Sequence, residues 1–308
     1  MNVLSLFDGM SCGQIALKRA GIKVDKYYSS EIDKYAIKVT QANFHSTIQL
    51  GDIAQVSAKK LPTIDLLIGG SPCQGFSFAG KQLNFSDPRS ALFFEYVRLL
   101  KECKPRYFLL ENVRMKKEYQ DVISEALGVQ PIRINSNLVS AQNRDRYYWT
   151  NIKCVDQPQD EGVMLEDIIE LDNAESLIDV SRIKKTWDTK NYLQYDLSGK
   201  VYKSQDQRAY KLNGKHGALA ASRCASKVKV LLRDKSKCVR SGGRGSYDRH
   251  EWDSVDNLHI RKLSVIECER LQTVPDNYTN SASNTQRYKM LGNCWTVDVI
   301  AHILRYIA

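Results

Sequence analysis

No stretch of this 308-residue chain approaches the ~20 consecutive apolar residues that a membrane-spanning helix requires. Its first residues, MNVLSLFDGM, also lack the basic start and the long apolar stretch of a secretory signal. We therefore expect a cytoplasmic protein that has no membrane partner.

Short cysteine spacings are absent as well. The chain has 8 cysteines, but the two closest in sequence, Cys224 and Cys238, lie 14 residues apart, so there is no CxxC or other zinc-type spacing. No internal repeat or low-complexity tract is present. The sequence therefore predicts no metal centre, and any cysteine with a role has to be argued singly.

Charge is plentiful, and its distribution is uneven. The net charge is +10, and residues 181–261 carry 19 Lys and Arg against 8 Asp and Glu, whereas residues 151–180 carry 1 against 9. A basic segment of this size suggests a polyanionic partner, most simply a nucleic acid. A solvated basic surface is the alternative that composition alone leaves open.

The first 150 residues alternate short β-rich runs with helical patterns. The expected strands are 3–7, 26–30, 64–70 and 106–112, and the expected helices are 14–21, 32–44, 91–103 and one near 117–127. This alternation predicts an α/β fold, a doubly wound parallel sheet with helices on both faces. The strands end in FDGMSCG, SSEID, IGGSPCQG and LLENV, so we expect a ligand site at this edge of the sheet.

After Trp149 the alternation stops. The acidic and basic stretches are only weakly patterned, with turn signals at Asn213-Gly214 and at 241–243, which favours a smaller, β-rich second domain. Helical periodicity returns over 263–272 and 296–307. We divide the chain into a first domain of residues 1–155 plus 275–308 and a second of residues 156–274.

Cys73 and Glu111 are the candidate reactive residues. Cys73 follows a proline at the end of a buried strand, where a thiolate could act as a nucleophile. The loop after it is polar and contains glycine, so it could act as a mobile lid. Glu111 ends the apolar strand 106–112, which can lie beside the strand that leads to Cys73. The alternatives are a buried thiol for Cys73 and a helix cap or a surface ion pair for Glu111.

Gln142, Arg144 and Arg146 alternate along an expected strand and so share one face. Two guanidinium groups and an amide suit a phosphate or a polar ring, although a solvated strand face has the same pattern. Glu31 closes the second strand, where a carboxylate can hydrogen-bond a ribose hydroxyl. Asp52 could accept a hydrogen bond from an adenine amino group. With the glycine turn after the first strand, these carboxylates suggest an adenosine-containing cofactor.

The ordered set FDGMSCG, SSEIDKYA, GDI, GGSPCQGFSFAGKQ, ENV, QNRDR, RKLSVIECERLQTVPDNY and LGNCWTVDVI resembles the cytosine-5 DNA methyltransferase family. The resemblance covers nearly the whole chain apart from about 155–260. The run FLLENV followed by SAQNRDRYYWTNI is similar to the catalytic domains of the animal de novo methyltransferases, and the short chain favours a stand-alone bacterial or phage enzyme.

The resemblance implies a Rossmann-like domain that uses S-adenosylmethionine as methyl donor, without a metal. Cys73 would add to carbon 6 of a cytosine flipped out of the DNA helix, because a stacked base cannot be reached. Glu111 would contact ring nitrogen 3 and the exocyclic amine, and Arg146 would hold the ring oxygen with support from Arg144. The positions that match cofactor contacts are Phe7, Asp8, Gly9, Ser11, Glu31, Ile32, Asp52, Ile53, Leu92, Asn293 and Trp295.

The region 155–260 falls where this family places its target-recognition domain, and the basic segment coincides with it. We expect DNA contacts from Gln74, Arg89, Gln142 and Arg244, of which Arg244 lies in the glycine-rich SGGRGSYDR and could equally touch only solvent. Double-stranded DNA is the expected partner, with a cognate restriction endonuclease as a further one, in a bacterial cell or a phage-infected host.

Three alternatives to this assignment exist. The same chemistry could act on a tRNA cytosine, because one branch of the family has RNA substrates. A catalytically silent DNA-binding member would be expected to lack Cys73, Glu111 or the arginines, and this chain keeps them. A nicotinamide-dependent oxidoreductase fits the sheet but leaves PCQ, ENV and QxRxR unexplained.

Overall fold

The computed structural model describes residues 1–71, 88–170 and 263–307, together with six strands between residues 185 and 262. Side chains are described for residues 1–71, 92–170 and 263–307. Cys73, Gln74 and Arg244 lie outside the described residues, and Arg89 is described only as part of a helix.

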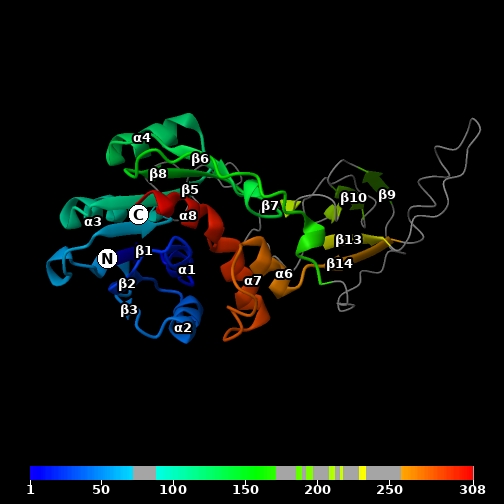
Figure 1. Ribbon diagram of the computed structural model, residues 1–308, viewed down its shortest axis with the longest axis horizontal. Helices are drawn as coiled ribbons and strands as arrows, with labels where there is room; N and C mark the ends of the chain where they lie inside the picture. Colours follow the sequence, from blue (N-terminus) through cyan, green and yellow to red (C-terminus); the bar gives the residue numbers. More distant parts are fainter. Residues whose placement is uncertain are drawn as a thin grey trace, which may run out of the picture.

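A seven-stranded sheet forms the main body of the protein (Figure 1), with the strand order β3-β2-β1-β4-β5-β8-β6. Its strands are β1 (Asn2–Leu6), β2 (Lys26–Ser30), β3 (Ile48–Gln49), β4 (Leu66–Gly69), β5 (Tyr107–Val113), β6 (Ile132–Asn135) and β8 (Asp145–Thr150). The pairs from β3 to β5 are parallel, whereas β8 runs antiparallel to both β5 and β6. The predicted α/β fold with a doubly wound sheet is confirmed.

Helices cover both faces of this sheet. They are α1 (Cys12–Arg19), α2 (Lys34–Asn43), α3 (Pro88–Cys103), α4 (Lys117–Leu127), α6 (Val265–Leu271), α7 (Asn284–Asn293) and α8 (Val297–Leu304). Short 3-10 helices span Ile53–Gln55, Ala58–Lys60, Ser136–Leu138, Leu165–Asp167 and Arg305–Ile307. Neither the strand β6 nor the helix α7 was expected from the sequence.

The apolar residues of the strands divide into two core clusters. Within β4, Leu66 and Ile68 belong to the cluster that contains α1 and α8, and Leu67 belongs to the one that contains α3 and α4. Adjacent strand residues point to opposite faces, so a nearly all-apolar strand is buried on both sides. The short apolar strands in the sequence are explained by this arrangement.

A second sheet of five strands has the order β14-β13-β11-β10-β9. Its strands are β9 (Lys185–Asp188), β10 (Tyr192–Asp196), β11 (Arg208–Lys211), β13 (Lys229–Arg233) and β14 (Leu258–Lys262). A further strand, β12 (His216–Gly217), pairs in parallel with β7 (Gln142–Asn143) of the first region. The β-rich nature of this region agrees with the sequence analysis.

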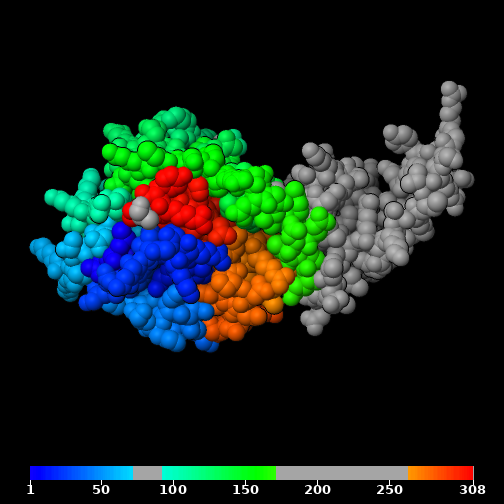
Figure 2. Space-filling view, in the orientation of Figure 1, coloured from blue at the N-terminus to red at the C-terminus, as the bar shows by residue number. Residues whose placement is uncertain are grey.

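The boundaries of the two predicted domains stay predictions. Leu165, Ile168 and Ile169 pack in the same core cluster as α1 and α8, and so do Val265 and Leu271 of α6. In the space-filling view (Figure 2), the segments around α6 and α7 lie against the N-terminal part of the chain. Both ends of the segment 156–274 therefore contribute to the core of the main sheet.

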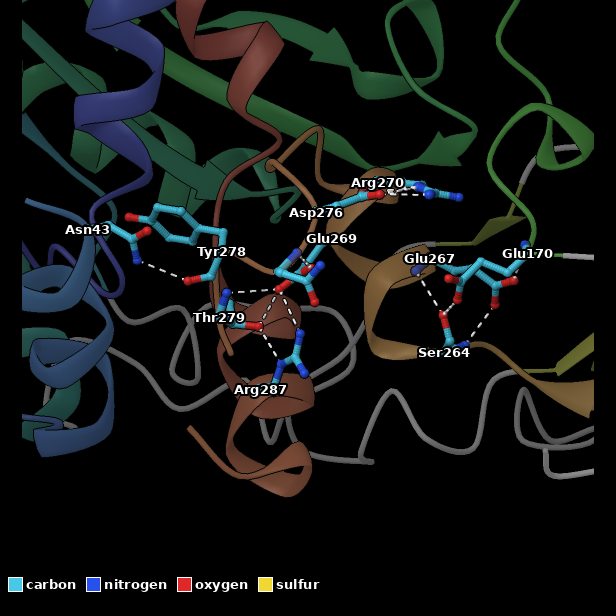
Figure 3. A network of polar contacts seen from close by, with 11 residues as sticks. Asn43, Glu170, Ser264, Glu267, Glu269, Arg270, Asp276, Tyr278, Thr279 and Arg287 are labelled. Carbon is cyan, nitrogen blue, oxygen red and sulfur yellow. Dashed lines mark hydrogen bonds and ion pairs between the residues drawn. The ribbon is translucent and has the colours of Figure 1, made fainter. Parts of the chain in front are cut away.

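A buried glutamate, Glu269, holds the segment that follows the second sheet (Figure 3). Glu269 is fully buried and accepts hydrogen bonds from the backbone nitrogens of Asn277 at 2.7 Å and Thr279 at 2.9 Å. It also pairs with the guanidinium of Arg287 at 3.1 Å. A buried carboxylate is stable only when it is paired in this way, so Glu269 fixes the path of the chain from α6 to α7.

The same segment reaches the turn after β1. The Tyr278 hydroxyl donates to the carbonyl oxygen of Met10 at 2.6 Å, and the Asn43 amide of α2 donates to the Tyr278 carbonyl at 2.9 Å. The motif 261–278 thus connects the second sheet to the first strand end. In the described part of the chain, no helix is long and apolar enough to cross a membrane.

Candidate active site

The turn between β1 and α1 has an unusual backbone. Phe7, Gly9 and Ser11 all lie in the left-handed region, with φ values of 57°, 58° and 59°. Only glycine adopts this region without strain, so the surrounding contacts must hold the other two residues there. The turn lies at the carboxyl end of β1, where ligands of open α/β sheets bind.

The carboxylate of Asp8 lies inside this turn and is only 8% exposed. It accepts hydrogen bonds from the hydroxyls of Ser5 at 2.6 Å, Tyr27 at 2.7 Å and Ser29 at 2.9 Å, and from that of Ser11. Burial raises the pKa of Asp8 above its usual range, although the four hydroxyl donors act in the opposite direction. The side chain of Asp8 therefore points into the protein and holds the turn together.

Glu31 closes the neighbouring strand β2 and also bonds to this turn. Its Oε2 accepts from the backbone nitrogen of Gly9 at 2.8 Å, and its Oε1 accepts from the nitrogens of Ile32 and Asp33, each at 2.8 Å. The apolar side chain of Ile32 next to it is 76% exposed. A fixed carboxylate beside an exposed apolar face suits a ribose and an adjoining base.

Asp52 and the apolar residues near it complete this part of the edge. Asp52 is exposed, and its Oδ1 accepts from the nitrogen of Ala54 at 3.0 Å. Phe7 and Leu92 are partly exposed apolar residues packed on the same core cluster as Ile53. Apolar surface together with carboxylate acceptors fits an adenosyl group, so the described residues are compatible with the cofactor that the sequence suggests.

Glu111 and Arg146 form an ion pair at the next strand ends. Arg146 Nε lies 2.9 Å from Glu111 Oε1, and the two side chains are 14% and 12% exposed. The antiparallel register of β5 and β8 sets Val113 opposite Arg146 and Glu111 opposite Tyr148. Burial, followed by the negative charge of Glu111, raises the pKa of Tyr148 well above its usual range. The pairing joins two residues that the sequence analysis had selected separately.

Arg144 has other partners. Its guanidinium donates to the carbonyl oxygens of Gly292 at 3.4 Å and Cys294 at 2.9 Å, and its residue is 4% exposed. Burial, with a smaller contribution from the positive charge of Arg146, lowers the pKa of Arg144 to about 10. Gln142 is fully buried. The three residues expected on one strand face thus have different surroundings, because the strand is split into β7 and β8 at Arg144.

Trp295 lies between the two halves of this edge, close to the end of β4. A Cβ atom on Gly70 would lie 2.9 Å from Nε1 of Trp295 and 3.2 Å from Oε2 of Glu111. A Cβ atom on Gly13 would lie 3.5 Å from Cζ3 of the same indole. Asn293, two residues earlier, is exposed. Glycine is therefore required at position 70 for the indole and the carboxylate to approach.

The described residues also indicate where the segment with Cys73 begins. Ser71, the last described residue before it, accepts a hydrogen bond on its Oγ from the Asn112 amide at 3.1 Å, and Asn112 is the neighbour of Glu111. The strands β4 and β5 pair directly, as the sequence analysis expected. Among the described residues, no group of three or more His, Cys, Asp or Glu side chains could hold a metal ion.

Of the residues that donate to Asp8, Ser11 was expected at the site, whereas Ser5, Tyr27 and Ser29 were not. Ser5 lies in the mostly apolar strand β1 and Ser29 lies in β2, whose sequence is KYYSS, and both are fully buried. Tyr27 is 3% exposed, and its hydroxyl has space because position 13 is a glycine. For Ser5, a hydroxyl in a mostly apolar strand was the available signal, but its partner could not be identified without the structure.

Comparison with known proteins places the whole chain in one family. The family model for C-5 cytosine-specific DNA methylases matches residues 1–308. The type II methyltransferase M1.ScrFI of Lactococcus lactis subsp. cremoris is 30% identical over 311 residues, which are 97% of this chain and 75% of that protein. M.HhaI of Haemophilus parahaemolyticus is 28% identical over 336 residues, which cover 100% of this chain and 93% of that protein.

A phage protein matches over a shorter region. The orphan methyltransferase M.SPRI of Bacillus phage SPR is 40% identical over 166 residues, which are 50% of this chain but only 38% of that protein. The match to the orphan methyltransferase M.Rho11sI of Bacillus phage rho11s likewise covers 33% of that protein. These matches span 38% and 33% of the two phage proteins.

Solved structures share the fold at low sequence identity. Entamoeba histolytica methyltransferase EhMeth has a TM-score of 0.73 and 18% identity, with 100% of this chain and 97% of that chain covered. A protein described as a putative DNA modification methyltransferase encoded within an E. coli prophage has a TM-score of 0.65 and 19% identity, with 100% and 98% covered.

Proposed function

The chain belongs to the C-5 cytosine-specific DNA methylase family, and from this premise we propose that it transfers a methyl group from S-adenosylmethionine to carbon 5 of a cytosine in double-stranded DNA. The observation that supports the proposal most directly is the ion pair of Glu111 and Arg146. The ion pair lies at the strand end next to Gly70 and Ser71. Ser71 precedes Cys73 by two residues in the sequence.

In the proposed reaction the Cys73 thiolate forms a bond to carbon 6 of the flipped-out cytosine. The electron pair of the C5–C6 double bond then makes carbon 5 nucleophilic. S-adenosylmethionine, when bound, supplies the electrophilic methyl group that carbon 5 takes up. Transfer breaks the bond between sulfur and the methyl group and leaves S-adenosylhomocysteine. Loss of the carbon 5 proton to water then restores the double bond and releases the Cys73 thiolate.

Glu111 and Arg146 are the residues proposed to bind the base. Glu111 contacts ring nitrogen 3 and the exocyclic amine and stabilises the ring when carbon 6 is attacked, and Arg146 holds the ring oxygen. The ion pair between them keeps both side chains at the site before a base arrives, which reduces the rearrangement needed on binding.

Arg144 acts in this proposal as a positioning residue. It binds the carbonyls of Gly292 and Cys294, on either side of Asn293 and directly before Trp295. Through these contacts it keeps the C-terminal segment at the edge of the sheet. The cofactor would be held by the turn 7–11, the acidic residues Glu31 and Asp52, and the apolar side chains described above.

DNA contacts are proposed for Gln74, Arg89 and Arg244 and for the basic segment 181–261 as a whole. Gln142 would have to be uncovered to reach DNA, because it is fully buried, so its contact stays a prediction. A cognate restriction endonuclease is proposed as a partner, because M1.ScrFI and M.HhaI are described as type II methyltransferases. The bacterial and phage sources of the relatives make a bacterial cell or a phage-infected host the proposed place of action.

The decisive experiment compares Cys73→Ala with the matched control Cys154→Ala, which removes an exposed thiol. Transfer of labelled methyl groups is measured on duplex DNA and on tRNA. We expect Cys73→Ala to abolish transfer to DNA while cofactor binding persists, and Cys154→Ala to remain active. Comparable turnover by Cys73→Ala would contradict the covalent mechanism, and preferential labelling of tRNA would contradict DNA as the substrate.

Trapping provides an independent measurement. DNA that carries 5-fluorocytosine at the target should form a denaturation-resistant adduct at Cys73, because fluorine cannot leave as the proton does. The adduct is located by mass spectrometry of the digested protein. Binding of this DNA with no adduct and no methyl transfer, even to unmodified cytosine, would instead indicate a silent DNA-binding protein.

A further inference from the structure

The side chain of Asp8 is a buried carboxylate without a positive partner among the described residues. Its hydrogen-bond donors among the described residues are the uncharged hydroxyls of Ser5, Ser11, Tyr27 and Ser29, and no ion pair of the described residues includes it. Two other buried acidic side chains differ from Asp8 in this respect, since Glu111 pairs with Arg146, and Glu269 of α6 pairs with Arg287.

The geometry of the four hydroxyls fits the ionised form of Asp8. Oδ1 accepts from Ser5 and Tyr27, and Oδ2 accepts from Ser11 and Ser29, so each oxygen has two donors. An ionised carboxylate only accepts hydrogen bonds, and this arrangement satisfies both of its oxygens. Hydroxyl groups stabilise the charge locally but do not cancel it.

The residues around Asp8 leave space for these four hydroxyl donors. A Cβ atom on Gly13 would lie 2.7 Å from the Tyr27 hydroxyl, so a larger residue at position 13 would push this hydroxyl away from Asp8. Ser11 lies in the left-handed region at the start of α1, where its hydroxyl reaches Oδ2. The strained turn and the hydroxyls thus converge on a single negative charge.

The position of this charge has an electrostatic consequence for a ligand. Asp8 lies in the turn at the carboxyl end of β1, and Gly9, its neighbour, is bonded to the carboxylate of Glu31. A buried charge acts through a low effective dielectric and is screened little by salt. The negative potential at this strand end therefore favours a ligand that carries a positive charge there over an equally shaped neutral one.

We propose that Asp8 makes the site discriminate between the methyl donor and its product by charge. S-adenosylmethionine has a positive sulfonium, whereas the S-adenosylhomocysteine left after transfer has a neutral thioether of nearly the same shape. The uncompensated carboxylate of Asp8 binds the first more tightly than the second and so assists release of the product. This inference rests on the proposed function, because it assumes that cofactor.

The test measures the affinities of S-adenosylmethionine and S-adenosylhomocysteine by calorimetry on the full chain. Asp8→Asn removes the charge and nearly keeps the shape, and Ser29→Ala is the matched control that removes one donor but keeps the charge. We expect Asp8→Asn to lower the ratio of the two affinities by about tenfold, which corresponds to the loss of a charge–charge interaction over a few ångströms at a partly screened site. Ser29→Ala should leave the ratio close to that of the wild type, even if both affinities fall.

The ratio of the two affinities distinguishes this electrostatic role from a purely structural one, because damage to the turn would weaken the binding of both ligands alike. An unchanged ratio in Asp8→Asn would overturn the proposal. If Asp8→Asn does not fold, the wild type still decides: an analogue with a protonated amine in place of the sulfonium should bind more tightly than S-adenosylhomocysteine, and equal binding would overturn the inference. A wild type that binds none of these ligands would overturn the proposed cofactor as well.

Discussion

The carboxyl ends of β1 and β5 each carry a buried carboxylate, and the two differ in how the charge is treated. Glu111 at the end of β5 is 2.9 Å from the guanidinium of Arg146, whereas Asp8 after β1 is surrounded by neutral hydroxyls. Both strands pair with β4, so the two carboxylates belong to the same edge of one sheet.

The difference indicates a division of roles along this edge. A paired carboxylate is held in place with little net charge, which suits a group that must align a neutral ring. An unpaired one keeps its electrostatic influence, which suits recognition of a cation. Trp295 separates the two regions, with Gly13 on one side of its indole and Gly70 on the other.

Removing Glu111 should give the largest effect. Glu111→Ala leaves the Arg146 guanidinium largely buried without its carboxylate, and we expect a loss of about 3 kcal/mol in unfolding free energy. Methyl transfer should fall by at least about 10²-fold. Urea unfolding and labelled-methyl transfer check both results.

The matched variant for this comparison is Asp8→Asn. This substitution leaves no unpaired cation among the described residues, so it should lower the unfolding free energy less than Glu111→Ala does. Removing both charges with Glu111→Gln and Arg146→Met together should recover part of the stability, although not the activity. A larger loss of unfolding free energy for Asp8→Asn than for Glu111→Ala would contradict the distinction between the two carboxylates.

Substitution of Gly13 and Gly70 should give effects of intermediate size. The first variant should lose mainly cofactor affinity, and the second should lose mainly turnover. In Gly13→Ala the new methyl group meets the Tyr27 hydroxyl at 2.7 Å and Cδ1 of Ile68 at 2.6 Å, so the turn and cofactor affinity should suffer most. In Gly70→Ala it meets Trp295 and Glu111, so turnover should fall more than cofactor affinity. Each should cost about 1–3 kcal/mol of unfolding free energy. Calorimetry and steady-state kinetics separate the two patterns, and identical patterns would show that the regions are not distinct.

The smallest effect concerns pH. Burial raises the pKa of Asp8 in the folded protein above the value of 3.8 expected in an unfolded chain. The folded state therefore takes up this proton more readily, and the contribution of Asp8 to stability grows as the pH falls from 7 toward 4. The unfolding free energy of the wild type minus that of Asp8→Asn should rise over this range in urea titrations. A difference that falls instead would mean that Asp8 is stabilised as an anion.

Much of the main sheet could be predicted from local patterns. β1, β4 and β5 are mostly apolar runs bounded by turn residues, β2 is a short tyrosine-containing run, and α3 begins and ends within three residues of its predicted range. α7 could not be predicted, because its sequence NTQRYKMLGN has little apolar periodicity and only its end, Met290 to Gly292, is buried. β6 has only 4 residues, too few for a periodic signal.

The candidate site was predictable in its members but not in its contacts. Motif spacing selected Glu111, Arg144 and Arg146, and the resemblance to a family selected Asp8 as a cofactor contact. The structure shows that Arg144 turns away from Arg146 to the carbonyls of Gly292 and Cys294, and that the Asp8 side chain points inward. Alternation along a strand could not reveal either fact, because the partners lie on distant segments.

The sequence by itself determined the fold class, the family, and the kinds of residue that gather at one edge of the sheet, because apolar periodicity and strand ends are local properties. Only the tertiary structure decided which charges are paired. Whether a buried carboxylate meets a guanidinium or a set of hydroxyls depends on ångström-scale distances between residues far apart in the chain, such as Glu111 to Arg146 and Asp8 to Tyr27. Those distances are set by the packing of whole strands and helices against one another.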